Sequence, residues 1–143
     1  MSGAFIPSGL RRWIHQRAEG RCEYCGMPET FSFASHQIDH IVAEKHGGPT
    51  KPDNLALCCT LCNRYKGSDL TAVDPDTGGV VPLFHPWRHV WADHFRLTPE
   101  GTLDSPTSEG RATIRLLQMN RAERMEERRL LMLAGLYSQP ARG

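Results

Sequence analysis

The chain has 143 residues, 39% of them hydrophobic, and a formal net charge of only +1. This length allows one modest hydrophobic core and excludes two independent domains, so we expect a single domain over residues 1–143. The near-neutral charge excludes a whole-protein field that attracts polyanions, and no apolar run is long enough to span a bilayer. Residues 1–10 also lack the pattern of a signal peptide, so we predict a soluble, cytoplasmic protein.

Residues 8–20 are predicted to form the first helix. Ser8 is placed as an N-cap, and Gly20 is the expected stop. The apolar residues recur at helical spacing and predict a buried side made of Leu10, Trp13, Ile14 and Ala18. The other side carries Arg11, Arg12 and Arg17. A solvated face is the favoured interpretation of these arginines, and contact with phosphate groups is the alternative.

Two Cys-x2-Cys pairs come next along the chain, Cys22 with Cys25 and Cys59 with Cys62. Four thiolates in two such pairs can hold one tetrahedral Zn²⁺. A zinc ion with four protein ligands has no open position, so we predict a structural site that contributes folding energy. The chain has five cysteines. Cys58 is the expected bystander, because replacing Cys59 by Cys58 would break the two-residue spacing.

The segment between the cysteine pairs is predicted to form a strand at 37–41 and a second strand at 55–58. Turn-forming residues at 46–54 form the loop that folds the strands back on each other. Thr60 is the expected N-cap of a helix that Gly67 ends. The order is strand, loop, strand, helix.

The remainder of the chain gives weaker signals. We predict a strand at 80–84, a short helix within 86–97, a hairpin over 97–103, a helix that starts at Thr107 or Ser108, and a last helix from Asn120 to about Leu136. Arginines on the last two helices are interleaved with glutamates, which favours a solvated face over a DNA-binding stripe; they are Arg111, Arg115, Arg121, Arg124 and Arg128. This part is expected to pack onto the strand-strand-helix unit.

Residues 22–66 resemble the HNH endonuclease family, whose small ββα-metal fold cleaves phosphodiester bonds with one divalent ion. The markers are Asp39-His40-Ile41, Gly47-Gly48, Asp53-Asn54-Leu55 and Cys59-x2-Cys62-Asn63-x2-Lys66. The resemblance implies an α+β fold with a zinc-stabilised core at about 20–68, an N-terminal helix and a C-terminal α/β extension at 69–143. That extension, with Trp91 and Asp93-His94-Phe95 among its markers, resembles one found in a group of small stand-alone bacterial HNH proteins.

The resemblance also implies a role for each site residue. His40 matches the general base, and Asn54 matches the residue that steadies the loop around it. Asp39 and Asn63 match the protein ligands of the catalytic ion, with Asn63 where many members have a histidine. Oxygen donors of this kind indicate Mg²⁺ or Mn²⁺. The implied activity is metal-dependent hydrolysis of DNA.

Other interpretations stay open at this point. A non-catalytic, zinc-stabilised nucleic-acid-binding protein is the main rival, and a cysteine-based redox protein is a third hypothesis. Structural or solvent roles are favoured for His36 and His46, and a second metal cluster of His85, His89 and His94 is disfavoured. The tryptophans Trp13, Trp87 and Trp91 are predicted to belong to the core rather than to stack on bases.

Overall fold

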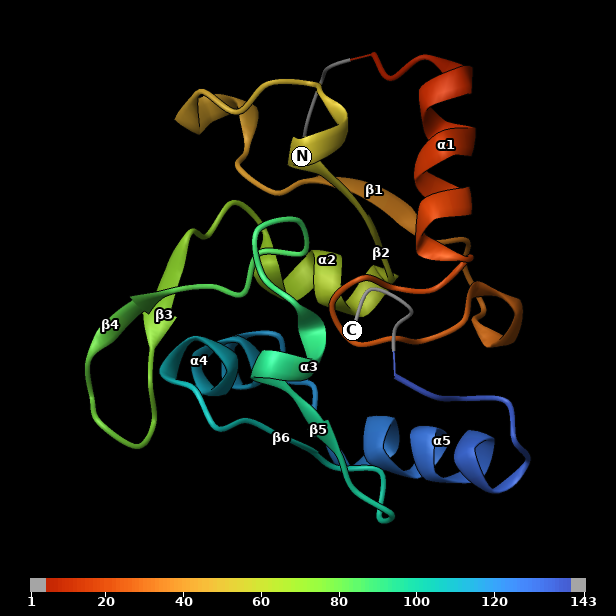
Figure 1. Cartoon of the computed structure of the whole chain (residues 1–143), viewed down its shortest axis with the longest axis vertical. Coiled ribbons are helices and arrows are strands. Elements are labelled where there is room, and N and C mark those ends of the chain that lie inside the picture. The colour runs from red at the N-terminus through yellow and green to blue at the C-terminus, as the bar shows by residue number, and fades with distance from the viewer. Residues whose placement is uncertain (1–4, 140–143) are drawn as a thin grey trace.

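The computed structural model describes residues 5–139, which combine α-helices with small antiparallel sheets in an α+β arrangement. In Figure 1, α1 lies at one end of the long axis, α2 lies near the centre, and α5 lies at the other end. None of the described helices is long and apolar enough to cross a membrane. Three short 3-10 helices lie in the first half of the chain, at Glu29–Phe31, Glu44–His46 and Pro52–Asn54.

Helix α1 spans Ser8–Ala18 and buries Ile14. Pro7 occupies the N-cap position and no side chain caps the helix, so the prediction that Ser8 is the cap is wrong. The helix ends where Glu19 and Gly20 both adopt positive φ angles, of 55° and 69°. The predicted stop is therefore confirmed, because two successive left-handed residues cannot continue an α-helix.

Strands β1 (Gln37–His40) and β2 (Leu55–Cys58) form an antiparallel pair in which His40 is opposite Leu55. Residues directly opposite each other share a face of the sheet, and side chains alternate between faces along a strand. One face therefore carries Ile38 and His40, and the other carries Gln37 and Asp39. Ile38 packs with Ile14 of α1 in a small apolar cluster.

Helix α2 spans Thr60–Lys66, close to the predicted range, and ends at Gly67. Its cap is Cys59 rather than Thr60, because the Sγ atom of Cys59 accepts a hydrogen bond from the backbone N–H of Cys62. The same hydrogen bond thus caps α2 and joins the two cysteines of the second pair.

The C-terminal part contains two more hairpins and three helices. Strands β3 (Thr71–Val73) and β4 (Val80–Pro82) pair, as do β5 (Arg96–Leu97) and β6 (Leu103–Asp104). The helices are α3 (Trp91–His94), α4 (Ser108–Leu116) and α5 (Ala122–Leu133). Thr107 caps α4 through its hydroxyl group, as predicted. Strand β3 was not predicted.

The main core joins the cysteine-containing unit to the C-terminal part. Its buried residues from the first half include Tyr24 and the cysteines, and those from the second half include Phe84, Trp91, Phe95 and Leu117. The indole N–H of Trp91 donates to the carbonyl oxygen of Tyr24 at 2.9 Å. The prediction that the C-terminal part packs onto the unit is confirmed.

Several side chains lie in other surroundings than the sequence indicated. Asn120 does not cap α5; its amide pairs with the backbone of Leu103 at 2.9 Å and 2.8 Å. Trp13 is 43% exposed and stacks on Trp87 instead of entering the core. Arg17 is not solvated, because its side chain is 8% exposed and forms an ion pair with Glu23.

The inner face of α5 contradicts the prediction of a solvated arginine face. Arg124 and Arg128 are buried, whereas Leu130 and Leu133 are exposed. Each buried guanidinium donates to backbone carbonyl oxygens, Arg124 to that of Leu117 at 2.7 Å and Arg128 to that of Gly101 at 2.8 Å. These hydrogen bonds make the burial of an arginine possible, since a buried polar group without a partner is costly.

Candidate functional site

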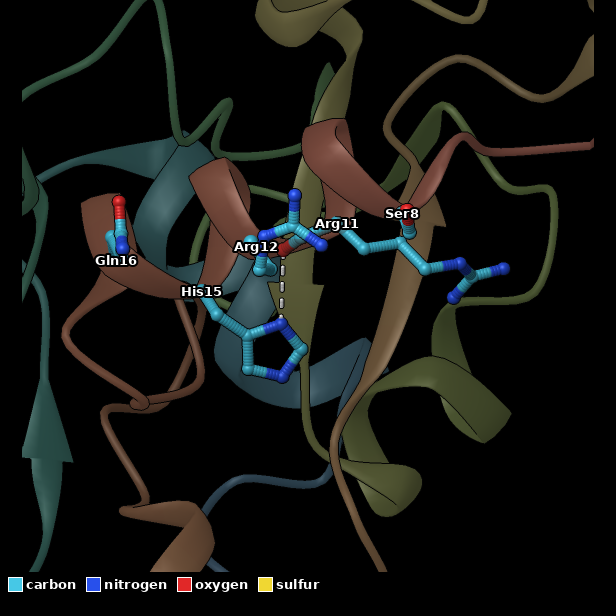
Figure 2. A pocket seen from close by; sticks show the side chains of 5 residues that line it. All are labelled: Ser8, Arg11, Arg12, His15 and Gln16. Carbon is cyan, nitrogen blue, oxygen red and sulfur yellow. Dashed lines mark hydrogen bonds between the residues drawn. The ribbon is translucent and has the colours of Figure 1, made fainter.

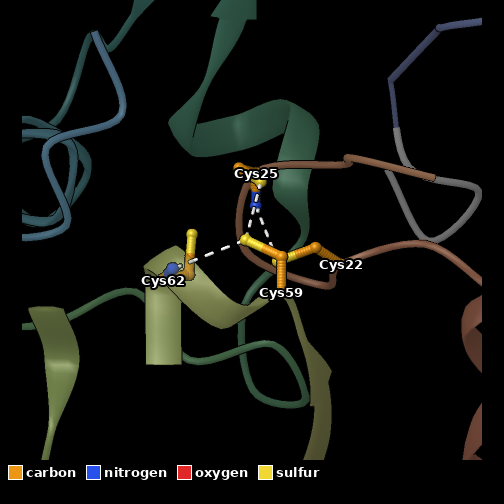
Figure 3. Close-up of side chains that lie close together, drawn as sticks. All are labelled: Cys22, Cys25, Cys59 and Cys62. Carbon is orange, nitrogen blue, oxygen red and sulfur yellow. Dashed lines mark hydrogen bonds between the residues drawn. The ribbon is translucent and has the colours of Figure 1, made fainter. Parts of the chain in front are cut away.

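The cysteines of the two Cys-x2-Cys pairs meet at one point, as Figure 3 shows. Their Sγ atoms all lie within 4.8 Å of one another, and those of Cys25 and Cys59 are 3.7 Å apart. A tetrahedral zinc with bonds of about 2.3 Å holds its sulfur ligands about 3.8 Å apart, so the cluster has the size of a zinc tetrathiolate. The structure brings together four residues that could hold a metal ion: Cys22, Cys25, Cys59 and Cys62.

Local backbone structure points both pairs at the same centre. The backbone N–H of Cys25 donates to Cys22 Sγ at 3.4 Å, and the N–H of Cys62 donates to Cys59 Sγ at the same distance. Gly26, with φ 83°, closes the first turn by donating to the carbonyl oxygen of Cys22. These N–H groups would stabilise thiolate ligands. Cys58 is buried outside the group, and burial raises the pKa of its thiol, as expected for a bystander.

His40 lies at the end of β1 and is 3% exposed. Its Nε2 atom is 2.9 Å from the hydroxyl oxygen of Thr50. The Nδ1 atom is buried and has no hydrogen-bond partner within the described residues. Sequence reasoning missed Thr50, because nothing in a loop threonine ten positions after the histidine marks it as a partner.

Asn54 ties together the two ends of the loop that follows His40. Its amide pairs with both backbone groups of Val42 at 2.9 Å, and its Nδ2 atom also donates to the carbonyl oxygen of Pro49 at 2.8 Å. Gly48 permits this approach, because a Cβ atom there would lie 1.7 Å from the carbonyl oxygen of Val42. Gly48 and Asn54, two of the residues on which the family resemblance rests, therefore stabilise the same loop.

Asp39 has two protein partners that sequence reasoning missed. Its Oδ2 atom is 2.9 Å from Nζ of Lys66, and the hydroxyl of Tyr24 donates to the same oxygen at 3.2 Å. Burial raises the pKa of the Asp39 carboxyl, with the charge of Lys66 opposing it. Asn63 lies on the same side of β1 and donates through Nδ2 to the side-chain oxygen of Gln37.

The structure places Asp39 and His40 next to each other at the end of β1 but divides the predicted catalytic residues between the two faces of the hairpin. Asp39 is on the face of the hairpin that contacts α2, and Asn63 belongs to α2 and contacts Gln37 at the start of β1. His40 is on the other face of the hairpin, as strand alternation requires. No hydrogen bond or ion pair joins His40 to either residue in the part of the chain that the structure describes. The contacts of Asp39 use Oδ2 and that of Asn63 uses Nδ2, so one oxygen of each is left for an ion.

The other histidines have structural or surface roles. His36 is buried with its Nε2 atom 2.7 Å from the carbonyl oxygen of Met27, and exposed His46 contacts that of Ser68 at 3.1 Å. Burial lowers the pKa of His85 to about 4. Across residues 5–139, the cysteine group is the only set of three or more His, Cys, Asp or Glu side chains at mutual ligand distance, so no second cluster of histidines forms there.

A shallow basic hollow lies on α1, away from the cysteines. Figure 2 shows the five side chains that line it, Ser8, Arg11, Arg12, His15 and Gln16. Both arginines are exposed, which agrees with the sequence interpretation, and the Nδ1 atom of His15 is 3.1 Å from the carbonyl oxygen of Arg11. The hollow offers positive charge but holds none of the predicted catalytic groups.

Arg124 is the most unexpected neighbour of the cysteine group. Its Nη2 atom is 3.2 Å from Cys62 Sγ and 3.9 Å from Cys59 Sγ. The sequence did carry a signal: Arg124, Arg128 and Leu131 recur at positions i, i+4 and i+7 of α5, which is the pattern of an inward stripe. Interleaved glutamates led to the opposite interpretation.

Comparison with known proteins identifies the segment that holds these residues. The family model of the HNH endonuclease matches residues 22–69. These residues form an HNH endonuclease domain. The HNH domain is also similar to part of the CRISPR-associated endonuclease Cas9 of Corynebacterium diphtheriae, with 38% identity over 71 residues. That match covers 47% of this chain but only 6% of the Cas9 protein. The match assigns residues 22–69, and not the rest of the chain, to the HNH endonuclease family.

Proposed function

We propose that this chain is a metal-dependent HNH endonuclease that hydrolyses phosphodiester bonds in DNA. In this proposal His40 is the general base, Asn54 holds its loop, and Asp39 and Asn63 bind one Mg²⁺ or Mn²⁺ ion. The observation that carries it is the environment of His40 within the HNH match: one ring nitrogen contacts Thr50, and the other has no partner among residues 5–139. The fold we propose is a ββα-metal core at about 20–68, within a single domain of residues 1–143.

The environment of His40 suits proton transfer. A hydroxyl oxygen can accept the proton of Nε2, which leaves Nδ1 as the nitrogen with a lone pair for a proton. Nδ1 is buried in this structure, so water must gain access to it before it can act as the base. The loop clamped by Asn54 carries Thr50, so the clamp also fixes the orientation of the imidazole.

The residues on the α2 side suit a hard divalent ion. Asp39 and Asn63 each offer an oxygen atom that has no donor within the described part of the chain, and Mg²⁺ takes only one or two such protein ligands. The ammonium group of Lys66 next to Asp39 means that this position already accommodates a positive charge. A bound ion would stabilise the negative charge that develops on the phosphate and on the leaving oxygen.

Cleavage of supercoiled plasmid tests the proposal. The zinc-loaded wild type should nick or linearise the plasmid when Mg²⁺ or Mn²⁺ is added, and His40→Ala should be slower by about 10²- to 10⁴-fold. His46→Ala is the matched control, because His46 is exposed on the same loop, and it should keep wild-type activity. Equal cleavage by wild type and His40→Ala would show that His40 is not the base.

The second candidate function is nucleic-acid binding without catalysis. The observation that favours it is the ion pair of Asp39 with buried Lys66, which already neutralises the carboxylate. This alternative predicts that DNA is bound but not cleaved with either ion. Both candidate functions imply that the protein works in a reducing compartment such as the cytoplasm. All the cysteines are free thiols, and a metal group made of cysteines needs them reduced.

A further inference from the structure

The C-terminal segment at 121–139 contacts both cysteine pairs of the metal group. On the second pair, Arg124 of α5 lies 3.2 Å from Cys62 Sγ and 3.9 Å from Cys59 Sγ. On the first pair, the hydroxyl of Tyr137 donates to the carbonyl oxygen of Cys25. Arg124 is 5% exposed and Tyr137 is 6% exposed, so both contacts are shielded from water.

A third contact holds the end of this segment in place. The guanidinium of Arg21, next to the first cysteine, lies 5.7 Å from the centre of the Tyr137 ring. Arg21 also donates to the carbonyl oxygen of Gln139 at 3.0 Å. The segment therefore crosses the metal group and is attached at both sides of it.

The charges of the two partners match. One Zn²⁺ with four thiolates carries a net charge of −2, and a buried charge is costly unless an opposite charge or hydrogen-bond donors compensate it. Arg124 supplies one positive charge and an N–H donor directed at sulfur. Within residues 5–139, the ion pairs do not include Arg124, so the sulfur cluster is its anionic partner.

Arg128 is a natural comparison on the same helix. It is 1% exposed and lies one turn from Arg124, but its donors reach carbonyl oxygens of Gly101 and Met119 and no sulfur. Burial of an arginine in α5 thus does not by itself require the metal group. The contact with thiolate sulfur is particular to Arg124.

We propose that residues 121–139 form a metal-dependent cap, in which Arg124 couples the docking of α5 to occupancy of the four-cysteine site and slows loss of zinc. When zinc leaves, the compact anionic centre is lost and Arg124 is left buried without its partner. That situation favours release of α5 from the core. The cap rests on the zinc assignment and is independent of the nuclease chemistry.

Zinc transfer to a chromogenic chelator tests the cap. Zinc-loaded Arg124→Met should release zinc about 10- to 100-fold faster than wild type, the range by which loss of an outer-shell partner weakens metal sites. Arg124→Lys keeps the positive charge, so its rate of zinc release should lie between those of wild type and Arg124→Met. Arg128→Met is the control, measured at a temperature where all variants are folded by circular dichroism, and should release zinc at the wild-type rate. Equal rates for Arg124→Met and wild type would overturn the cap, as would equal acceleration by Arg128→Met.

Limited trypsin digestion of the unmodified protein tests the same cap if Arg124→Met does not fold. Zinc-loaded protein should resist cleavage after Arg121 and Arg129, and chelator-treated protein should be cut there before it is cut after Arg11 and Arg12 in α1. Simultaneous cleavage at both ends would overturn the cap. Absence of zinc from the purified protein would overturn both the cap and the zinc assignment. The zinc-release rates and the digestion pattern do not depend on nuclease activity, so they test the cap separately from the proposed function.

Discussion

The cysteine group and the proposed catalytic site differ in how complete they are without an ion. The four sulfur atoms already lie within 4.8 Å of one another, with N–H groups and Arg124 directed at them. In the catalytic site, by contrast, Asp39 is paired with Lys66 and Asn63 with Gln37. The cysteine group is built into the core, whereas the proposed catalytic site would bind an ion only in competition with these side chains. The structural metal should therefore govern stability, and the catalytic metal should govern rate.

Loss of the structural metal should have the largest effect. Cys62→Ser removes one of four ligands at the centre of the core, and structural zinc contributes about 10–16 kcal/mol of apparent binding free energy in small zinc domains. We expect Cys62→Ser to lose its cooperative thermal transition, followed by circular dichroism. Cys58→Ala is the control and should keep one zinc per chain. A cooperative transition at the wild-type temperature in Cys62→Ser would contradict this account.

Asp39→Asn should lower both stability and rate, because it removes a proposed metal ligand and leaves Lys66 buried without its counter-charge. Breaking a buried ion pair in this way costs about 3–5 kcal/mol, measurable by urea denaturation. Compared with Asp39→Asn, the double variant Asp39→Asn/Lys66→Met should regain most of the lost stability, but it should not regain cleavage activity. Recovery of cleavage in the double variant would show that Asp39 does not hold the ion.

Thr50→Val should have a moderate effect on rate. It removes the hydroxyl next to His40 Nε2 without a large change in shape, and a lost buried hydrogen bond costs about 1–3 kcal/mol. We expect slower plasmid cleavage with unchanged zinc content. Thr71→Val, at an exposed position of β3, provides the comparison. An unchanged cleavage rate in Thr50→Val would mean that His40 is oriented by other contacts.

The smallest effect is expected on α1. If the hollow at Arg11 and Arg12 contacts DNA phosphates, Arg11→Ala/Arg12→Ala should weaken binding several-fold and lower the salt slope by about one per lost contact. The rate at saturating DNA should stay that of wild type. An unchanged salt dependence would favour the simpler interpretation of a solvated face.

The sequence predicted correctly those segments in which the local pattern of residue types and the spacing of the motif residues indicate the same element. The ranges of β1, β2 and α2 and the convergence of four cysteines followed from turn residues, β-branched residues and cysteine spacing. Strand β3 escaped prediction because Thr71–Val73 has only three residues, and none of them is buried. Its stability comes from pairing with β4, which a local pattern does not reveal.

The partners of the site residues escaped prediction for a different reason. Thr50, Lys66 and Arg124 act through contacts with residues far away in the sequence, and only the folded chain brings them together. Arg124 shows the difficulty best, since an arginine among glutamates is solvated in most helices. Here the sulfur atoms of Cys59 and Cys62 are its partners instead.

Single-turnover cleavage of a labelled DNA duplex across a Mg²⁺ titration tests the central claim most directly, with zinc content measured in the same samples. The account predicts that wild type reaches a plateau rate as Mg²⁺ rises, and that His40→Ala, with one zinc per chain, stays about 10²- to 10⁴-fold below it at every concentration. Matching rates for the two zinc-loaded proteins, or cleavage by wild type that needs no divalent ion, would contradict it.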